Sequence, residues 1–342
     1  MGNATTKTAA KRTKKSFQPP VVVESAPAAP ALIAIKGFDT NLVCNPIGVP
    51  FQFEIGKTYT HAGSVRACKS GFHAVEYPLD VFSYYAPADS RYAEVVLSGE
   101  LSRHGNDTKV AAASITISAE LRVPDLIQRA IKWVIDRCTP ANAQHATGYQ
   151  SASSATGDQS ASSATGYRSA SSATGDRSAS SATGDQSASS ATGYRSASSA
   201  TGDRSASSAT GYRSASSATG YQSASSATGY QSASSATGYQ SASSATGDRS
   251  ASSATGDRSA SLNTGNDGSS EVLDGERQSF GVAIASGFNS KARAAAGSAL
   301  VVVFRNDDGS LRHIKAVIAG TDDVKPDTWY ALSVDGELIE AQ

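Results

Sequence analysis

Hydrophobic and polar positions follow three patterns along the 342 residues of the chain. In residues 93–101 (AEVVLSGEL) and 112–121 (AASITISAEL), apolar and polar residues alternate, which predicts half-buried strands. The stretch that follows has helical spacing instead and has Pro124 near its start, which predicts an amphipathic helix. Its apolar face consists of Leu126, Ile127, Ala130, Ile131, Val134 and Ile135. The tail predicts two hairpins with turns at NDDG and VDG, in which residues 301–304, 314–318 and 329–334 form a small antiparallel sheet.

A nine-residue repeat lies between these two parts. Glycine recurs thirteen times, at every ninth position from Gly148 to Gly256, in copies of SASSATG. Nine residues turn an α-helix by about 900°, which would put successive copies on opposite faces, so a long helix is excluded. The small polar composition favours disorder. Regular alanines that suit a thin coil, and glycines where the coil bends, favour a parallel β-solenoid.

We predict the solenoid, with two units per coil and about 4.8 Å between coils. The thirteen copies then form roughly six or seven coils. The two alanines of each unit are three positions apart, so strict alternation places them on opposite faces and leaves the inward set open.

Two positions of each unit vary. The first is Tyr seven times and Asp six times, and the second is Arg seven times and Gln six times. Because the pair lies beside the turn, we predict that it points outward. The Tyr rings of neighbouring coils would stack, and Asp would lie next to Arg of a neighbouring coil, so that like charges do not form columns. The first coils would present a ladder of Tyr149, Asp158, Tyr167, Arg168, Asp176, Arg177, Tyr194 and Arg195. Solubility and recent tandem duplication are favoured over a dedicated ligand-binding ladder, and a Ca²⁺-binding roll would need an Asp and further Gly in every copy.

These patterns predict a mainly β protein in four parts. They are a disordered basic arm and linker (1–31), an N-terminal α+β domain that is β-rich with a C-terminal helix (32–140), a nonapeptide-repeat parallel β-solenoid or β-roll (141–303), and a small C-terminal antiparallel β-hairpin cap (304–342). We expect the helix to cap the domain or the first coil, since an open end exposes unpaired strand edges.

Charge and cysteine content narrow the classes of function. The chain has 30 basic and 30 acidic residues, so net charge gives no attraction to nucleic acid or to an anionic membrane. The arm is locally basic, and for it solubility is favoured over nucleic-acid or membrane contact. Its start, MGNATT, fits the N-myristoylation pattern at Gly2, with a chance match favoured. Three cysteines, Cys44, Cys68 and Cys138, lack metal-ligand spacing and predict buried, reduced thiols, which we favour over a disulfide between Cys44 and Cys68 or a metal site that these two form with His61 or His73. We expect no cofactor and no metal.

No apolar run reaches the length of a signal peptide or of a transmembrane segment, so we expect the protein to stay in the cytoplasm of the cell that makes it.

Two resemblances to known families follow. SASSATGYQSASSATGDRSA and the later GVAIASGFNSKARAAAGSALVVV resemble the small-residue β-rolls in the heads of trimeric autotransporter adhesins, over residues 146–303. This resemblance implies a possible homotrimer; surface adhesion does not carry over, because we find no signal peptide, coiled-coil stalk or membrane barrel.

KGFDTNLVC and GKTYTHAGSVRACKSGFHAVEYPLDVFSYY are similar to an N-terminal domain of unknown function from tailed bacteriophages, over residues 34–137. In mycobacteriophage-type relatives this domain is joined to short Ala-Thr-Gly repeats. The resemblance implies a phage product in the host cytoplasm, with a host or phage protein as its partner and no assigned chemistry.

Catalysis is the alternative to a purely structural role. His73, Tyr84 and Glu94 are the candidate catalytic residues, and GFHAVEYPLDVFSYY is similar to the His and Tyr elements of ADP-ribosyltransferase-like folds. Motifs of hydrolases, phosphate loops and zinc sites are not found. We therefore expect a non-enzymatic structural or interaction protein whose solenoid is a rigid spacer or a binding surface. The alternatives are a host-modifying enzyme and a virion- or tail-associated fibre.

Overall fold

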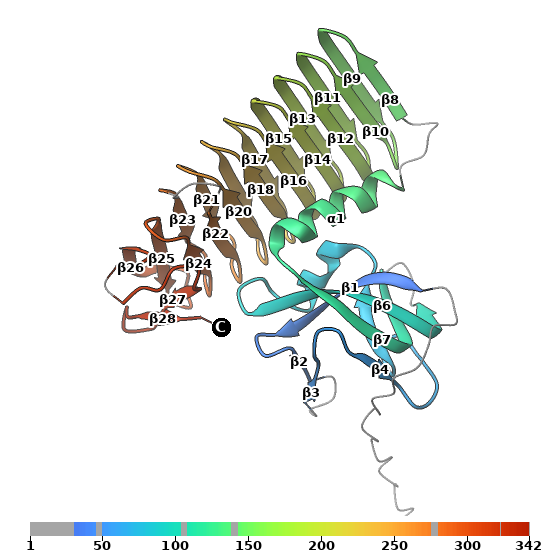
Figure 1. Ribbon diagram of the computed structural model, residues 1–342, viewed down its shortest axis with the longest axis vertical. Helices are drawn as coiled ribbons and strands as arrows, with labels where there is room; N and C mark the ends of the chain where they lie inside the picture. Colours follow the sequence, from blue (N-terminus) through green and yellow to red (C-terminus); the bar gives the residue numbers. More distant parts are fainter. Residues whose placement is uncertain are drawn as a thin grey trace, which may run out of the picture.

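The computed structural model describes residues 31–45, 50–103, 108–137, 143–274, 280–321 and 323–341. It confirms a mainly β protein with an N-terminal sheet domain, a β-solenoid of about nine turns from residue 143 to 302, and small C-terminal antiparallel strands. The N-terminal domain lies against one side of the solenoid and not beyond its end (Figure 1). The predicted basic arm spans residues 1–31, and all of it except residue 31 lies outside the described residues.

The N-terminal domain is built on one antiparallel sheet in the order β4-β7-β5-β1-β6. β6 also pairs with β7, so β7, β5, β1 and β6 close on themselves. A two-stranded hairpin, β2 with β3, stands apart from this sheet. The elements of the domain are β1 (Leu32–Asp39), β2 (Val43–Cys44), β3 (Phe51–Gln52), β4 (Thr58–Thr60), β5 (Phe72–Val75), the 3₁₀ helix η1 (Pro78–Ser83), β6 (Ser90–Arg103), β7 (Lys109–Leu121) and the helix α1 (Val123–Ile135).

The predicted strands and helix of this domain are present. Alternation in β6 sends Ala93, Val95 and Leu97 into a core that also contains several aromatic rings. Helix α1 begins one residue before Pro124, which suits a residue without an N–H donor, and the Asp125 carboxylate accepts a hydrogen bond from the Arg122 amide at 3.1 Å.

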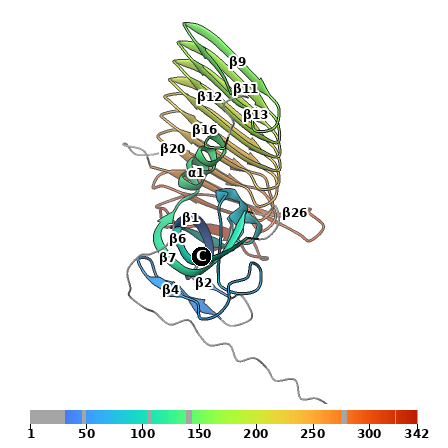
Figure 2. The same cartoon turned by 90° about the vertical axis from the view of Figure 1, so that its right-hand side faces the viewer.

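The solenoid consists of two parallel sheets in which each strand pairs with the strand 18 residues further on, as in Thr165 with Thr183. Two units per coil is therefore confirmed, and Figure 2 shows the flattened coils edge on. One sheet, here called the docked sheet, contains β8 (Ala143–Thr147), β10 (Ala161–Thr165), β12 (Arg177–Thr183), β14 (Arg195–Thr201), β16 (Arg213–Thr219), β18 (Ala233–Thr237), β20 (Ala251–Thr255), β22 (Ser269–Leu273) and β24 (Lys291–Ala294). The other, the open sheet, contains β9 (Gln150–Thr156), β11 (Arg168–Thr174), β13 (Gln186–Thr192), β15 (Arg204–Thr210), β17 (Ala224–Thr228), β19 (Ala242–Thr246), β21 (Ala260–Asn263), β23 (Val282–Ala285) and β25 (Ala299–Arg305).

The interior of each coil is filled by serine and alanine side chains, as expected for a thin coil. In β13 the inward residues are Ser187, Ser189 and Ala191, while Ala188 and Ser190 face solvent. Two serines and one alanine per unit therefore fill the core, which settles the inward set that alternation had left open. The hydroxyl of Ser189 donates to the serine one unit earlier at 2.9 Å, and this contact repeats from Ser162 to Ser261. Each of these buried hydroxyl groups is thus satisfied by its neighbour along the rod.

The glycine column is required chiefly by close backbone approach. Gly193 has no left-handed φ, yet a methyl group placed on it would overlap the carbonyl oxygen of Gly175 in the preceding coil. Gly184 adds a φ of +153°, which disfavours other residues as well. The predicted role of glycine in the bend is confirmed, with steric contact between coils as a second cause.

The tail pattern predicted one small antiparallel sheet, but the C-terminal strands belong to two different sheets. β26 (Leu311–Ile318) extends the open sheet beyond β25, whereas β27 (Tyr330–Leu332) and β28 (Leu338–Glu340) extend the docked sheet beyond β24. The reason is that each hairpin continues the backbone ladder of the sheet nearest to it. β25 spans the predicted boundary at 303/304 and the boundary at 140/141 lies outside the described residues, so the division into four parts stays a prediction.

Candidate functional site

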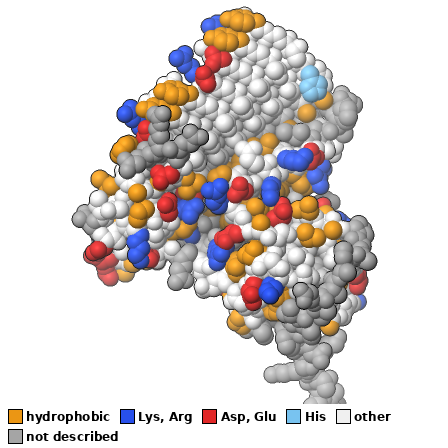
Figure 3. Space-filling view, viewed as in Figure 1, with side chains coloured by type: hydrophobic (Ala, Val, Ile, Leu, Met, Phe, Trp, Pro, Cys, Tyr) orange, Lys and Arg blue, Asp and Glu red, His pale blue; other side chains and the backbone are white. Residues whose placement is uncertain are grey.

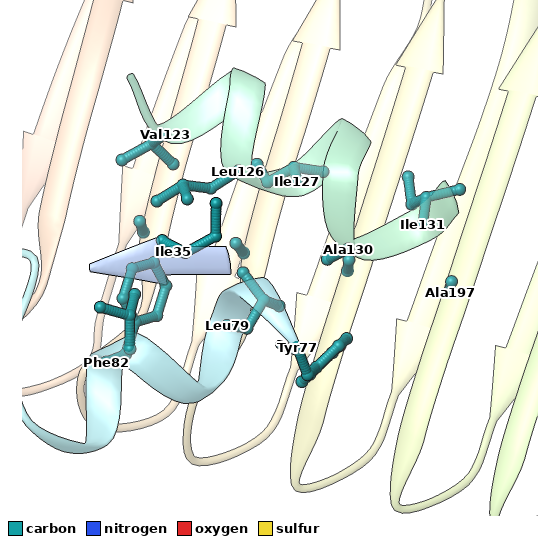
Figure 4. Packing of buried hydrophobic residues seen from close by; sticks show 14 of the residues in the cluster. Ile35, Tyr77, Leu79, Phe82, Val123, Leu126, Ile127, Ala130, Ile131 and Ala197 are labelled. Carbon is teal, nitrogen blue, oxygen red and sulfur yellow. The ribbon is translucent and has the colours of Figure 1, made fainter. Parts of the chain in front are cut away.

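Helix α1 lies across five successive strands of the docked sheet, from β12 to β20 (Figures 1 and 4). Beneath it the first alanine of each unit is buried, while the equivalent alanine of the open sheet, for example Ala188, is exposed. Figure 4 shows Leu126, Ile127, Ala130 and Ile131 of the helix at this contact. The buried alanines are Ala179, Ala197, Ala215, Ala233 and Ala251. The helix thus covers the domain, as predicted, but crosses the side of the coils and does not cap the first one.

The variable pairs lie on two opposite edges of the flattened solenoid, because successive units turn at alternate sides. The docked edge, which faces the N-terminal domain, carries the pairs 158–159, 176–177, 194–195, 212–213, 230–231 and 248–249. The open edge carries the pairs 149–150, 167–168, 185–186, 203–204, 221–222, 239–240 and 257–258. The sequence predicted one ladder, and the structure divides it between these two surfaces.

A buried carboxylate of the N-terminal domain is held by two arginines of the docked edge. Asp80, in η1, is 1% exposed. Its Oδ1 lies 3.0 Å from Nη1 of Arg213 and its Oδ2 lies 3.5 Å from Nη2 of Arg195. The Thr108 hydroxyl also donates a hydrogen bond to Oδ2. Asp80 is therefore a charge shared between two neighbouring coils, and Arg195, predicted to point outward, does so but is only 6% exposed because the domain covers it.

Other contacts of η1 extend the same interface over two more coils. The Gln231 side-chain amide, 1% exposed, donates to the Ser83 hydroxyl at 2.7 Å, and Nη1 of Arg249 donates to the Ser83 carbonyl at 2.9 Å. The Tyr77 hydroxyl donates to the Arg213 carbonyl at 3.2 Å. Burial and the nearby Asp80 raise the pKa of Tyr77 above its usual value, so its hydroxyl stays a donor. The contacts span four consecutive variable pairs of the docked edge.

The order of residues on the docked edge matches this contact. Arg177, Arg195 and Arg213 occupy three successive coils in register, whereas the open edge never has two arginines in succession. The prediction that like charges would not form columns is therefore wrong for the docked edge, because Asp80 supplies the opposite charge from another part of the chain. The pairing of one carboxylate with two adjacent arginines gives the domain one preferred register on the rod.

Tyrosine ladders run along the open edge. The rings of Tyr149 and Tyr167 stack at 5.1 Å between centroids, and those of Tyr221 and Tyr239 stack at 5.0 Å, as predicted. Tyr149 is 67% exposed. A hydrogen bond to Asp185 raises the pKa of Tyr167. Figure 3 shows hydrophobic, basic and acidic side chains as a rim along the side of the solenoid that lies away from the N-terminal domain.

The predicted ladder residues divide as follows. Tyr149, Tyr167 and Arg168 lie on the open edge, and Asp158, Asp176, Arg177, Tyr194 and Arg195 lie on the docked edge. Tyr194 belongs to a second stack, with Tyr212 at 5.2 Å, which continues to Tyr230.

The three candidate catalytic residues have different partners. Nε2 of His73 accepts a hydrogen bond from the Cys68 amide at 2.9 Å, so this nitrogen is occupied. Burial, with the positive charges of Lys109 and Lys36, lowers the pKa of His73 to about 4 and keeps the ring neutral. The Lys109 ammonium also lies 4.3 Å from the centre of the Tyr84 ring. Glu94 instead forms an ion pair with Arg129 of helix α1 at 2.7 Å. Their proposed catalytic roles stay predictions.

A polar cavity of about 310 Å³ lies where the N-terminal domain meets the docked edge. It is lined by Asp39, Tyr84, Tyr85, Ala86, Asp89, Ser90, Arg249 and Asp267. Among the residues that the structure describes, no group of three His, Cys, Asp or Glu side chains is placed to hold a metal ion. No helix within the same ranges is long and apolar enough to cross a membrane.

The thiols differ from each other. Cys44 is buried and accepts a hydrogen bond from the Tyr85 hydroxyl at 3.1 Å, as expected for a structural thiol. Cys68 is exposed, so the prediction of burial is wrong there; it lies in a tight turn with a φ of 63°. Cys138 lies outside the described residues.

The sequence reasoning missed Asp80, Ser83 and Tyr77, which make the docking contacts. One signal was present, because Asp80 is the only charged residue in the apolar stretch YPLDVFSYY. A lone carboxylate among apolar residues is buried only when it has a partner.

The comparisons with known proteins concern the N-terminal domain. Residues 32–129 match the family described as "Domain of unknown function (DUF7666)". The matched range includes η1 and the first half of α1, so it contains Tyr77, Asp80 and Ser83 but not Ala130, Ile131 or any of the repeat. No match to this chain was found among curated proteins or among solved structures.

Proposed function

We propose that this chain is a non-enzymatic interaction protein in which the solenoid is a rigid spacer with the N-terminal domain fixed to its side. The observation that carries the proposal is the docking of α1 and η1 over several coils, through buried alanines and the ion pairs of Asp80. A domain held at both a helix and a 3₁₀ helix cannot swing on a single hinge. The spacing between the domain and the far end of the rod is then set by the number of coils.

The open edge is the surface that we propose for a partner. Tyr and Arg are enriched where proteins bind each other, since both combine a large contact area with hydrogen-bonding groups. The docked edge supports this assignment, because the same kinds of residue there bind a protein surface, the chain's own η1. The proposed partner is a protein of the phage or of its host.

The cellular setting is part of the proposal. The similarity to a domain of tailed bacteriophages supports a phage product that acts in the cytoplasm of the infected cell. A virion- or tail-associated fibre is the second candidate, favoured by the rod shape. Mass spectrometry of purified virions separates the two, because peptides of this chain at stoichiometric amounts would establish the fibre and remove the cytoplasmic assignment.

The test between an interaction protein and an enzyme uses two sets of variants in the host cell. In the first, His73→Ala and Tyr84→Ala are made separately; in the second, Tyr149→Ser and Tyr221→Ser are combined on the open edge. An interaction protein keeps its effect on the host with the first set and loses it with the second. The reverse result would establish the enzyme with an ADP-ribosyltransferase-like domain. Circular dichroism of each purified variant confirms that the β structure is kept.

A further inference from the structure

Among the strands that the structure describes, none pairs with the outer backbone edge of β26, the last strand of the open sheet. β26 is the terminal strand in the order β26-β25-β23, and it pairs with β25 from Ala299↔Ile318 to Arg305↔Leu311. In Figure 1 it lies at the C-terminal end of the rod, opposite to the end formed by β8 and β9. An eight-residue edge strand is a template for another strand unless it is protected.

The direction of the hydrogen bonds identifies the exposed backbone groups. The Ala319 amide donates to the Ser298 carbonyl at 2.9 Å, and the Gly297 amide donates to the Ala319 carbonyl at 2.8 Å, so Ala319 faces β25. Hydrogen-bonding direction alternates along an antiparallel strand, so Lys315 and Val317 face β25 as well, whereas Ile314 and Ala316 point their N–H and C=O groups away from the sheet.

The solvent-facing side of β26 is apolar, in contrast to the rest of the open sheet. Ile314 is 64% exposed and Ile318 is 50% exposed. The sheet register continues this apolar character inward through two rows, Leu262–Ile284–Val301–Ala316 and Ala260–Val282–Ala299–Ile318. One strand further along the same face, at β19, the corresponding residues are Ala242 and Ser244. An apolar patch confined to the end strands of a sheet indicates an interaction site.

The charges of β26 are arranged so that they do not block this edge. Lys315 lies on the opposite, inner side, where its ammonium is 3.6 Å from a Glu337 carboxylate oxygen, and His313 contacts the Val334 carbonyl at 3.2 Å. On the outer side only Arg312 is charged within the strand. The Lys315 charge is thus paired with Glu337, and the outer face of the strand carries Ile314, Ala316 and Ile318 beside Arg312.

We propose that β26 pairs antiparallel with β26 of a second copy of this chain, about a two-fold axis at Ala316. In this register Ile314 of each copy lies opposite Ile318 of the other copy, so one apolar pair lies on each side of the axis. Arg312 then stands opposite Gly320 of the second copy, so no like charges face each other on the outer side. The open sheets of two rods then join into one continuous sheet.

The experiment measures the mass of the full chain by light scattering during size exclusion, over a range of concentrations. We expect a mass of two chains. Ala316→Pro removes only the donor that points away from β25, so the hairpin keeps its fold while the pairing is lost. Ile314→Lys places a charge in the apolar pair. Because the two-fold axis applies each change twice, each variant should raise the dimer dissociation constant by roughly 100-fold.

A matched control is Ser226→Lys, an exposed position on the same face in β17, which should keep the mass of two chains. Hydrogen exchange gives a second measurement, since the amides of Ile314 and Ala316 should become protected as concentration rises. A wild-type mass of one chain at all concentrations, a mass of three chains, or a dimer that survives both substitutions would overturn the proposal. The result is independent of the open edge, so it does not depend on the function proposed above.

Discussion

Replacing Asp80 tests whether the ion pairs hold the N-terminal domain on the solenoid. Asp80→Asn removes the charge and nearly keeps the shape, leaving Arg195 and Arg213 without their carboxylate. At 3.0 and 3.5 Å, and an effective dielectric constant of about 20, each attraction is on the order of 5 kcal/mol before desolvation. Because the arginine side chains are only 7% and 15% exposed, we expect a net loss of about 3 to 5 kcal/mol.

The assay is denaturant unfolding, followed by the fluorescence of Trp133. This ring lies 5.0 Å from Tyr77 at the interface, and a Trp329→Phe background makes it the only tryptophan. Asp203→Asn, an exposed position on the open edge, is the matched control and should change the free energy of unfolding by less than about 0.5 kcal/mol. Adding Arg195→Gln and Arg213→Gln to Asp80→Asn removes the uncompensated charges and should recover much of the loss. A loss below about 1 kcal/mol for Asp80→Asn, or no recovery in the triple variant, would refute the reasoning.

Three further predictions concern the domain and the rod. The pKa of His73 is about 4 in the folded protein and about 6.5 when unfolded, so the unfolded state binds the proton first and stability falls as pH drops from 6.5 to 4. His73→Gln should remove this loss. The measurement is the difference in the free energy of unfolding by urea between the two proteins, which should be constant above pH 6.5. Ser207→Ala interrupts the row of buried serine hydroxyls and should lower the free energy of unfolding by about 1 to 3 kcal/mol. The control is Ser208→Ala at the exposed neighbouring position, which should be within about 0.5 kcal/mol of wild type. Equal effects of the two substitutions would show that the hydroxyl row contributes nothing to stability. In Gly193→Ala the added methyl group overlaps the backbone of the preceding coil, whereas in Gly148→Ala it meets no atom within 4 Å. Gly193→Ala should therefore lower the melting temperature more than Gly148→Ala. A larger effect of Gly148→Ala would make backbone φ the main reason for the glycines.

Much of the fold is encoded locally. The alternation in residues 93–101 and 112–121, and the helical spacing after Pro124, predict β6, β7 and α1, because each pattern reports a single buried face. The period of nine excludes a long helix and predicts the solenoid, and two units per coil follow because one nine-residue unit is too short to close a turn around a core. The stacked tyrosines follow from the same register.

The inward set of the coil was not predictable from alternation alone. Ser189 and Ala191 face inward together because serine hydroxyls can satisfy one another only when they meet in register along the rod, a condition that depends on the neighbouring coils. Likewise the tail pattern gives its strands but not their sheets, since β26 and β27 each pair with whichever sheet ends beside them.

The candidate site shows the same division more sharply. By itself the sequence determined that the Tyr, Asp, Arg and Gln positions lie at the turns of a repetitive rod, because period and chemistry are local properties. Only the tertiary structure decided which turns meet Asp80. Asp80 and Arg195 are 115 positions apart in the chain, and the packing of α1 on the buried alanines goes together with their ion pair. Identical units thus acquire different roles, Ala197 as a buried contact and Ala188 as an exposed surface, because burial is a property of what packs against a residue and not of the residue itself.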